Sequence, residues 1–368
     1  MQSLKAVVVD DTIVYRKIVG DVLKDMPGVE VVGTANNGKI ALSKIKTLNP
    51  DFITLDIEMP EVSGIEVLKE LRKMDKPPLT IMLSTLTHQG GEMTIQALEL
   101  GAFDFIPKPE AGKMADNMLK VKKAIEPIIK VIKRRKGGMS AFGTTATRGK
   151  AAPAKPVVRK PVTPRVAISK TPVVKSKSEI VGIGISTGGP NALTKLIPML
   201  PPNLKAPILI VQHMPPMFTA SLANSLNNKS KLEVKEAQDG DVIEPGKVLI
   251  APGGKQMKIV AGGDGLTRKI KITDDPPENS CKPSVDYLFR SIAQHYVGRS
   301  TGVIMTGMGS DGSKGLVQMK KNGSVVIAQD EETCTVFGMP KEPIESGLAD
   351  VVAPLERIAG EIIKTVTL

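Results

Sequence analysis

The feature that most constrains the fold is a basic segment in the middle of the sequence. Between Arg134 and Lys177 there are twelve Lys or Arg residues, five Pro residues and no Asp or Glu. No helical or strand period is sustained there, and one-signed charge with scattered Pro predicts an extended, flexible linker. The chain of 368 residues is therefore expected to fold as two domains, each long enough for its own core.

The charge of this segment accounts for the charge of the whole chain. The net charge is +12, which equals the number of basic residues between Arg134 and Lys177. The rest of the chain is therefore close to neutral. A large positive charge often indicates nucleic-acid binding, but here it lies on a linker and not on a folded domain. We expect no nucleic acid among the partners, although a basic arm that contacts anionic partners remains an alternative.

Signals for export and for disulfide bonds are missing. The apolar residues near the N-terminus are followed at once by Asp10 and Asp11, and two carboxylates end any signal-like stretch. No run approaches the ~18 apolar residues that a membrane helix needs. The two cysteines, Cys281 and Cys334, are too few for a disulfide framework. We expect a cytoplasmic protein with no membrane insertion.

Before the basic segment, short aliphatic runs alternate with amphipathic patterns of helical period. Buried strands are predicted at 5–9, 29–34, 51–55, 80–83 and 103–106, and helices at 14–26, 39–48, 65–74 and 92–100. A last helix is predicted from near Met114 towards Arg135, with a kink or restart at Pro127. Five β/α units predict a doubly wound parallel sheet, with functional residues at the carboxyl ends of its strands.

After the basic segment the alternation resumes. Strands are predicted at 180–185, 207–211, 248–251 and 301–305, with a helix that begins at Pro190. A glycine-rich turn between 258–260 and 268–272 predicts a β-hairpin. The fold class is therefore α/β, with a second doubly wound domain that carries a hairpin excursion. We place the domains at 1–125 and 179–368, with the flexible linker at 126–178.

Charged and polar residues gather at the predicted strand ends of the first domain. Asp10 and Asp11 follow the first strand, Asp56 the third and Lys108 the fifth, while Ser84 ends the fourth. These ends converge on one crevice, where clustered carboxylates need a hard cation such as Mg²⁺. The set indicates phosphoryl transfer to a carboxylate. Any one Asp could instead cap a helix.

In the second domain, GISTGG at 184–189 joins a predicted strand to a predicted helix. Such a turn exposes a small nucleophile, Ser186, beside backbone N–H groups that can hold an oxyanion. A nucleotide-binding turn is the rival interpretation, because Gly182 and Gly184 begin a dinucleotide pattern. That pattern requires Gly where Thr187 stands and an acid where Gln212 and His213 stand.

A base and an orienting carboxylate are predicted for Ser186. His213 follows the strand next in sequence, so it can stand at the same sheet edge, whereas His88 lies in the first domain and His295 in an amphipathic helix pattern. Asp311 lies in a glycine-dense loop after a further strand. A buried Asp bonded to the far imidazole nitrogen would orient such a base. A simple turn residue is the alternative for Asp311.

The first domain resembles the response-regulator receiver family, which has a flavodoxin-like fold. The resemblance rests on Asp10-Asp11, LDIEMP at 55–60, Ser84 and Lys108-Pro109. It implies that Asp56 is phosphorylated by a histidine kinase. It also implies roles for further residues: Mg²⁺ binding by Asp10, Asp11, Asp56 and the Glu58 carbonyl, phosphoryl contacts from Lys108 and Ser84, and switching by Phe105.

The second domain resembles the protein-glutamate methylesterase family of chemotaxis. The resemblance rests on the motifs around Ser186, His213 and Asp311, with PSVD at 283–286 and VFGMP at 336–340. It implies that these three residues are nucleophile, base and orienter, with Thr187 and the Met308 N–H by the oxyanion. The implied substrates are glutamate methyl esters on cytoplasmic helices of methyl-accepting chemoreceptors, and the same acyl chemistry could deamidate glutamine. No cofactor is implied for the esterase reaction.

Two other functional classes remain open from the sequence. A DNA-binding response regulator would fit the receiver and the basic charge, but no helix-turn-helix pattern follows the linker. A non-catalytic scaffold that binds receptors would keep the fold without using Ser186. A serine-reactive probe separates the scaffold from the esterase.

Overall fold

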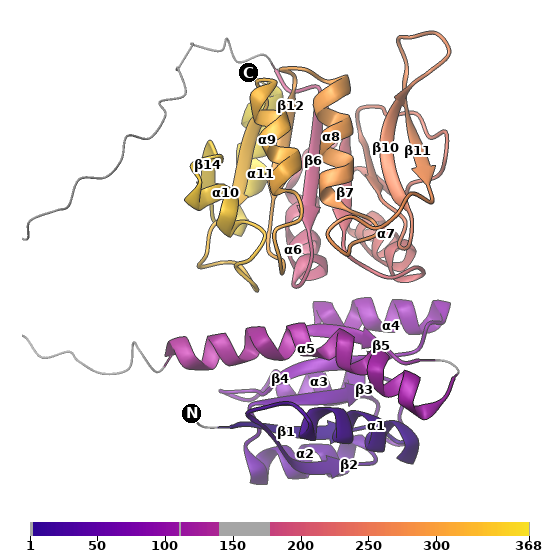
Figure 1. The fold of residues 1–368 in the computed structure, drawn as a ribbon, viewed down its shortest axis with the longest axis vertical. Coiled ribbons are helices and arrows are strands. Elements are labelled where there is room, and N and C mark those ends of the chain that lie inside the picture. Colours follow the sequence, from indigo (N-terminus) through magenta and orange to yellow (C-terminus); the bar gives the residue numbers. More distant parts are fainter. Residues whose placement is uncertain (1–2, 110–111, 140–176, 368) are drawn as a thin grey trace, which may run out of the picture.

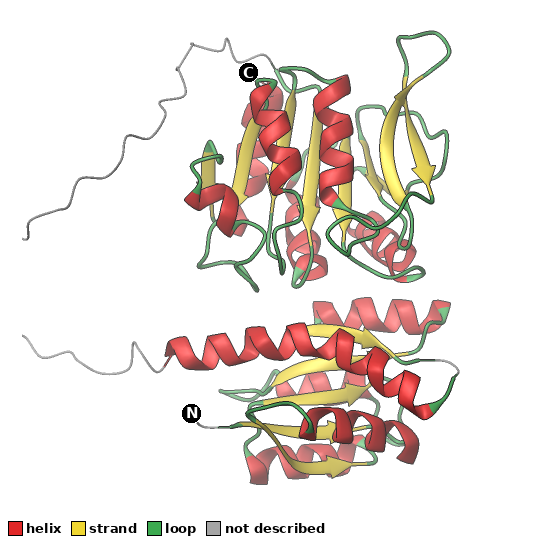
Figure 2. Ribbon diagram, viewed as in Figure 1, coloured by secondary structure: helices red, strands yellow, loops and turns green. Residues whose placement is uncertain are grey.

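The chain forms two stacked α/β domains (Figure 1, with helices and strands distinguished in Figure 2). The computed structural model describes residues 3–109, 112–139 and 177–367. The linker prediction for 140–176 lies outside the described residues. The α/β class and the presence of a parallel sheet in each domain, both predicted from alternating strand and helix patterns, are confirmed.

The N-terminal domain has a five-stranded parallel sheet in the order β2-β1-β3-β4-β5. Its strands are β1 (Leu4–Val9), β2 (Val29–Ala35), β3 (Phe52–Asp56), β4 (Leu79–Ser84) and β5 (Asp104–Pro107). The central strands are aliphatic and almost completely buried because helices cover both faces. The order reverses between β1 and β3, so the carboxyl ends of these strands border the crevice where such sheets bind ligands.

Five helices connect and cover these strands. They are α1 (Ile13–Lys24), α2 (Gly38–Leu48), α3 (Gly64–Leu71), α4 (His88–Glu99) and α5 (Met114–Met139). Polar caps begin several of them. Ser63, for example, forms a capping box with Glu66 at the start of α3. Helices α1 and α5 pack together, and α2, α3 and α4 form a second layer.

The predicted boundary after residue 125 does not match the last helix of this domain. Helix α5 continues to Met139 with Pro127 inside it. The reason is packing: Ile128, Ile129 and Ile132 lie beyond the predicted boundary, yet they are buried in the core under β1 and β4. Residues 126–139 are therefore helical and not part of a flexible linker.

The C-terminal domain has a seven-stranded parallel sheet in the order β14-β13-β12-β6-β7-β9-β8. Its strands are β6 (Ile180–Ile185), β7 (Ile208–Gln212), β8 (Glu233–Glu236), β9 (Lys247–Ile250), β12 (Ser300–Ile304), β13 (Val325–Gln329) and β14 (Val351–Ala353). The predicted hairpin is a separate antiparallel pair, β10 (Gln256–Ala261) and β11 (Arg268–Thr273). Strands β8, β13 and β14 were not predicted.

Helices again lie on both faces of this sheet. They are α6 (Gly189–Leu196), α7 (Phe218–Lys229), α8 (Val285–His295), α9 (Ser313–Lys321), α10 (Lys341–Glu345) and α11 (Leu355–Thr367), and a short 3-10 turn, η1 (Ile197–Met199), follows α6. Helices α8 and α9 pack together, as do α6, α7 and α11. Among the described residues, no helix is both long and apolar enough to cross a membrane.

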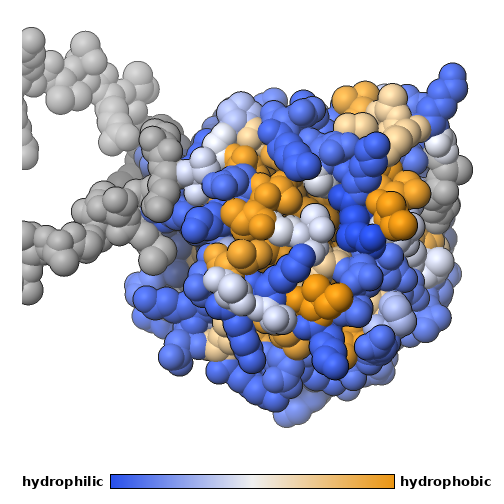
Figure 3. Space-filling model, turned by 90° about the horizontal axis from the view of Figure 1, so that it is seen from below, coloured by the Kyte–Doolittle hydropathy of each residue, from blue (hydrophilic) through white to orange (hydrophobic). Residues whose placement is uncertain are grey.

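The two domains meet through helices and through the loops at the strand ends of the C-terminal domain. Helix α4 packs against α6 and α7 (Figure 1). The ring of Phe105 in β5 lies 4.5 Å from the ring of Phe218 in α7. The opposite end of the N-terminal domain faces solvent, and Figure 3 shows hydrophobic residues near the centre of that end within a hydrophilic rim.

Candidate active site

Three neighbouring strands of the second domain bring the predicted residues to one edge of the sheet. Strand β6 lies between β12 and β7. Ser186 directly follows β6, His213 directly follows β7, and Asp311 lies in the loop after β12. All three strands are parallel, so these residues converge at their carboxyl ends.

Two glycines allow the backbone to turn closely around Ser186. Gly188 has φ of 80°, a left-handed conformation that glycine adopts without strain. A Cβ at Gly307, in the loop after β12, would lie 2.7 Å from the Ser186 Cβ, so only glycine lets this loop approach. The Ser186 N–H donates to the Thr306 carbonyl at 3.0 Å. The result is a serine held at the start of α6, only 9% exposed.

His213 and Asp311 form a close pair. The His213 Nε2 lies 2.8 Å from the Asp311 Oδ2. Burial lowers the pKa of His213, but hydrogen bonds with Asp311 and Cys281 outweigh burial and raise it to about 9. Burial raises the pKa of Asp311, but the His213 hydrogen bond and charge outweigh burial and lower it to about 2. The pair therefore favours a charged carboxylate next to a basic imidazole.

The start of helix α8 holds the Asp311 carboxylate in place. It accepts hydrogen bonds from the Val285 N–H at 2.7 Å, the Ser284 hydroxyl at 2.9 Å and the Asp286 N–H at 3.2 Å. The Asn279 amide donates to Asp311 and to Asp286, each at 2.9 Å. Helix N-termini favour negative charge, so Asp311 is fixed as an ionised orienting group. The sequence analysis did not identify Asn279, and it named Ser284 only as part of the PSVD motif at 283–286.

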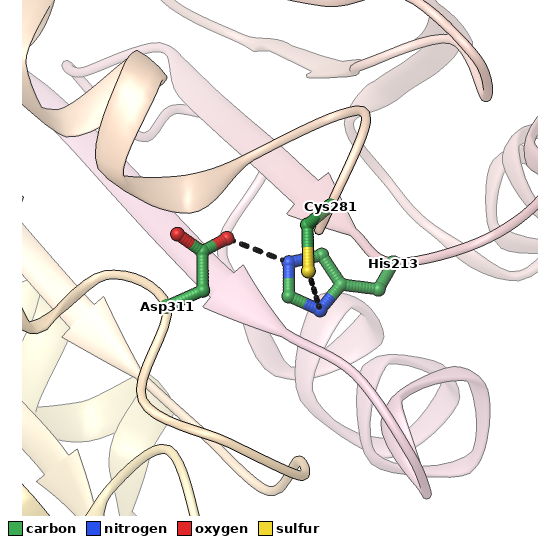
Figure 4. Close-up of side chains that lie close together, drawn as sticks. All are labelled: His213, Cys281 and Asp311. Atoms are coloured by element: carbon green, nitrogen blue, oxygen red, sulfur yellow. Dashed lines mark hydrogen bonds and ion pairs between the residues drawn. The ribbon is translucent and has the colours of Figure 1, made fainter. Parts of the chain in front are cut away.

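The other imidazole nitrogen faces a residue that was not predicted. Figure 4 shows the Cys281 thiol in front of the imidazole ring, with Sγ 3.8 Å from the His213 Nδ1. The Ser186 hydroxyl has no hydrogen bond to His213 among the described residues. Both residues nevertheless line one cavity of about 190 Å³.

That cavity lies between the domains. Thr187 and Met308, predicted near the oxyanion, line it together with Ser186 and His213. Residues of β5 and α5 line the opposite side. The Thr187 hydroxyl donates to Asp104 of β5 at 2.8 Å. The receiver-like domain therefore covers the site, and the sequence analysis missed Asp104 because its role depends on domain packing.

The predicted charged residues of the N-terminal domain also come together. The Lys108 ammonium lies 2.8 Å from Asp10 Oδ2 and 2.7 Å from Asp56 Oδ2. Burial, followed by the charge of Asp10, raises the pKa of Asp56 to about 6, against the lowering effect of Lys108. Burial also raises the pKa of Asp10. One lysine thus partly compensates two buried carboxylates.

The donor set of this crevice fits a hard divalent cation. Carboxylate oxygens of Asp10, Asp11 and Asp56 lie within 4.8 Å of one another, and oxygen-rich sites of this kind suit Mg²⁺. The Asp10 Oδ2 is buried and has no hydrogen bond of normal geometry among the described residues, despite its ion pair with Lys108. Glu58 also lines the crevice.

The predicted hydroxyl and aromatic groups differ in where they lie. Ser84 is buried, donates to the Gly90 carbonyl at 3.2 Å and accepts from Thr94 at 2.6 Å. Thr85, its neighbour, lines the crevice and was not singled out from the sequence. Phe105 lies at the domain interface. An aromatic residue that transmits a conformational change from one domain to the other would have to lie at this interface.

Comparisons with known proteins agree with the two-part architecture. The family model described as CheB methylesterase matches residues 181–362, and the model described as response regulator receiver domain matches residues 6–120. A protein-glutamate methylesterase/protein-glutamine glutaminase from Desulfotalea psychrophila is 54% identical over 368 residues, 100% of both chains. One of the same name from Bacillus subtilis is 43% identical, over 98% of this chain and 97% of its own.

A solved structure resembles the C-terminal domain. The CheB methylesterase catalytic domain of Thermotoga maritima is 46% identical, with a TM-score of 0.50. The match covers 51% of this chain and 99% of that chain. The seven-stranded domain described here is therefore similar to a methylesterase catalytic domain over nearly the whole of the latter.

Proposed function

This chain belongs to the CheB methylesterase family, and on that premise we propose that Ser186, His213 and Asp311 carry out its reaction. It is a response-regulator enzyme of chemotaxis with protein-glutamate methylesterase/protein-glutamine glutaminase activity. The observation that supports the residue assignment is the 2.8 Å pair of His213 and Asp311, because His213 lines the same cavity as Ser186.

The proposed reaction is acyl transfer through the serine. The Ser186 oxygen attacks the ester carbonyl, and the His213 Nδ1 accepts its proton because Nε2 is engaged with Asp311. The tetrahedral intermediate collapses, and methanol leaves with that proton. Water then attacks the acyl-serine with His213 again as base, which releases the glutamate carboxyl group and restores Ser186. A glutamine side chain would follow the same path and release ammonia.

Backbone N–H groups near Ser186 are the proposed donors for the oxyanion. Thr187 lies at the turn before α6, and Met308 lies in the loop after β12, on the wall of the same cavity. Donors that are already in position stabilise the charge that develops in the transition state. Thr187 also contacts the N-terminal domain, so the position of that domain would affect this part of the site.

We assign phosphorylation to Asp56. Its carboxylate would accept a phosphoryl group from a chemotaxis histidine kinase. The ammonium group of Lys108, now 2.7 Å from the carboxylate, would then form an ion pair with the phosphoryl oxygens. Asp10, Asp11, Asp56 and the backbone carbonyl of Glu58 are the proposed holders of Mg²⁺, which would neutralise charge during the transfer. Thr85 is a further candidate for the phosphoryl contact proposed for Ser84.

Activation would follow from movement of the N-terminal domain. In this structure β5 and α5 form one wall of the cavity that contains Ser186, so a receptor glutamate side chain cannot reach the serine without displacement of that wall. Phosphorylation at Asp56 would weaken the contact that Phe105 makes with Phe218. The proposed substrates are methylated or amidated side chains on cytoplasmic helices of methyl-accepting chemoreceptors, which need an uncovered cleft.

The assignment is tested with Ser186→Ala. We expect a folded protein that releases no methanol from methylated receptor, because loss of an activated nucleophile usually costs several orders of magnitude in rate. Circular dichroism checks the fold. A matched control is Ser230→Ala, at the end of α7 and outside the cavity. Methanol release at the wild-type rate by the folded Ser186→Ala protein would exclude this mechanism.

A further inference from the structure

The side-chain amide of Gln212 joins the backbone of the proposed nucleophile to the backbone of the proposed base. Gln212 is the last residue of β7 and lies opposite Ile185 of β6 in the sheet. Its Nε2 donates to the Ser186 carbonyl at 3.0 Å and to the His213 carbonyl at 3.2 Å. Both acceptors are carbonyl oxygens, so the amide must present its nitrogen to them, and its orientation is fixed.

The bond to Ser186 also fixes the direction of a proposed oxyanion donor. The Ser186 carbonyl and the Thr187 N–H belong to one peptide group, which is trans. In a planar trans peptide the C=O and the N–H point in opposite directions, so a donor that holds the carbonyl also aims the N–H. The Thr187 N–H has no backbone acceptor within the described part of the chain, and Thr187 lines the cavity together with Ser186 and His213.

A second bond to the same carbonyl cannot replace the bond from Gln212. The Gly189 N–H donates to the Ser186 carbonyl at 2.7 Å. Gly189 is the first residue of α6 and belongs to the same turn as Ser186, so this bond moves with the turn. Gln212 lies on another strand, immediately before His213. Its bond therefore holds the turn in place relative to the base.

The other end of the amide has a cost for stability. The Gln212 side chain is 2% exposed, and its Oε1 is buried without a hydrogen-bond partner among the described residues. A buried acceptor without a partner is destabilising, and an apolar side chain of similar size would avoid this cost. The amide also needs a glycine beside it, because a Cβ at Gly189 would lie 1.9 Å from Oε1. The role of Gln212 is therefore sought in the reaction and not in the stability of the fold.

We propose that Gln212 is a positioning residue of the hydrolase site, which holds the Ser186–Thr187 peptide so that the Thr187 N–H points at the oxyanion. This inference rests on the function proposed above. A donor that is already aimed stabilises the charge of the transition state more than it stabilises the uncharged ester. Loss of the Gln212 amide should therefore slow the chemical step and leave substrate binding almost unchanged.

Gln212→Met tests this role in the full chain with a phosphodonor present, because Met has a similar length but no N–H donor. We expect kcat and kcat/KM for methanol release to fall together by about 10–100-fold. KM and the midpoint of thermal unfolding should stay close to wild type. Gln318→Met, on the exposed side of α9, is the control and should keep the wild-type rate. A wild-type kcat in folded Gln212→Met, or a loss confined to KM, overturns the proposal.

Gln212→Glu gives a readout that a purely structural role would not move. The carboxylate has the shape of the amide but cannot donate to the Ser186 carbonyl, whereas the protonated carboxyl group can donate one bond. Burial raises the pKa of such a group, so protonation becomes accessible on mild acidification. The kcat of Gln212→Glu, divided by that of wild type at each pH, should rise as the pH falls. A ratio that does not change with pH overturns the proposal.

A double-mutant cycle tests whether Gly189 acts through the same amide. Gly189→Ala should lower kcat because its Cβ displaces the Gln212 amide, and it should lower kcat much less when Gln212→Ala is already present. Gly360→Ala is the control, since a Cβ at this position in α11 meets nothing within 4 Å. Additive effects of Gly189→Ala and Gln212→Ala overturn the positioning geometry.

The Ser186→Ala variant separates this inference from the proposed function. If Ser186→Ala is inactive while Gln212→Met keeps the wild-type kcat, only the role of Gln212 is overturned. If Ser186→Ala still releases methanol at the wild-type rate, the proposed mechanism fails, and the role of Gln212 fails with it.

Discussion

The Thr187 hydroxyl donates a 2.8 Å hydrogen bond to the Asp104 carboxylate, which links the residue after the proposed nucleophile to the receiver domain. Burial raises the pKa of Asp104 to about 6, although the bond from Thr187 lowers it. The ordinary value is 3.8. The Asp104 carboxyl group therefore binds its proton more strongly when the domains are docked than when they are separated. Docking should consequently depend on pH.

We expect the closed arrangement to be favoured by acid. The stabilisation of the closed arrangement by protonated Asp104 is fully present below pH 3.8 and is lost as the pH rises through about 6. Asp104→Asn, which cannot ionise, should stay closed at neutral pH and lower the basal rate. The measurement is the rate of methanol release without phosphodonor, expressed as the ratio of wild type to Asp104→Asn at each pH. Because both proteins share the other titrating groups, the effects of those groups cancel in this ratio. It should approach one only towards pH 3.8, rise as the pH increases from there to about 6, and level off above that. A ratio independent of pH would contradict the docking model.

The contact between α4 and α7 gives a second test of the closed arrangement. Glu99 accepts from the Ser225 hydroxyl at 2.6 Å and forms an ion pair with Lys229. Glu99→Ala should raise the basal methylesterase rate a few-fold, since a partly exposed charged contact contributes about 1 kcal/mol. Glu92→Ala is the control, because Glu92 lies on the same helix but forms its ion pair within α4, with His88. Equal basal rates for the two variants would show that this contact does not hold the domains closed.

Removal of the receiver domain should activate the enzyme. A fragment should begin at residue 177, because the Ser178 hydroxyl is buried at 2.7 Å from Thr301 and a start at residue 179 would lose this bond. Methanol release by residues 177–368 should exceed that of the unphosphorylated full chain, since tethering makes even a weak covering interface effective. If the fragment is equally slow, the receiver activates by direct contacts and does not inhibit by covering.

Asp311→Asn should lower the hydrolysis rate by about 10²–10⁴ while the fold is retained. The amide can still occupy the pocket at the start of α8, but it cannot accept all the bonds that the carboxylate accepts from His213, Val285 and Ser284. It also removes the charge that stabilises an imidazolium. Steady-state kinetics measure the hydrolysis rates of the wild type and of Asp311→Asn, and thermal unfolding checks that the variant retains its fold. An unchanged rate would make Asp311 a turn residue, and another carboxylate would have to orient His213.

The pH dependence of hydrolysis tests the His213 environment. Hydrogen bonds with Asp311 and Cys281 outweigh burial and raise its pKa to about 9. The base works as the neutral imidazole, so the rate should rise with pH until His213 loses its proton near 9. Asp311→Asn removes a cause of the raised pKa and should move this limb to lower pH. A wild-type limb centred near 6.5 would mean that the imidazole is free of these partners during turnover.

Much of the architecture could be predicted because it depends on local patterns. Aliphatic runs of strand length alternate with helical periods, and this alternation is enough to predict parallel sheets and their carboxyl ends. Asp10, Asp56 and Lys108 follow three different strands, so their convergence at one edge could be deduced. The same logic places Ser186 and His213, which follow adjacent strands.

The tertiary structure decided what no local pattern contains. Cys281 is 68 residues from His213 in sequence, and Asp104 is 83 residues from Thr187, so each contact depends on how separate elements pack. The end of α5 at Met139 was likewise set by burial of Ile128 and Ile132 and not by composition. A sequence determines which side chains stand at strand ends, because that follows from neighbours along the chain. Which distant group then contacts each of them depends on the packing of surfaces that form only after the elements fold.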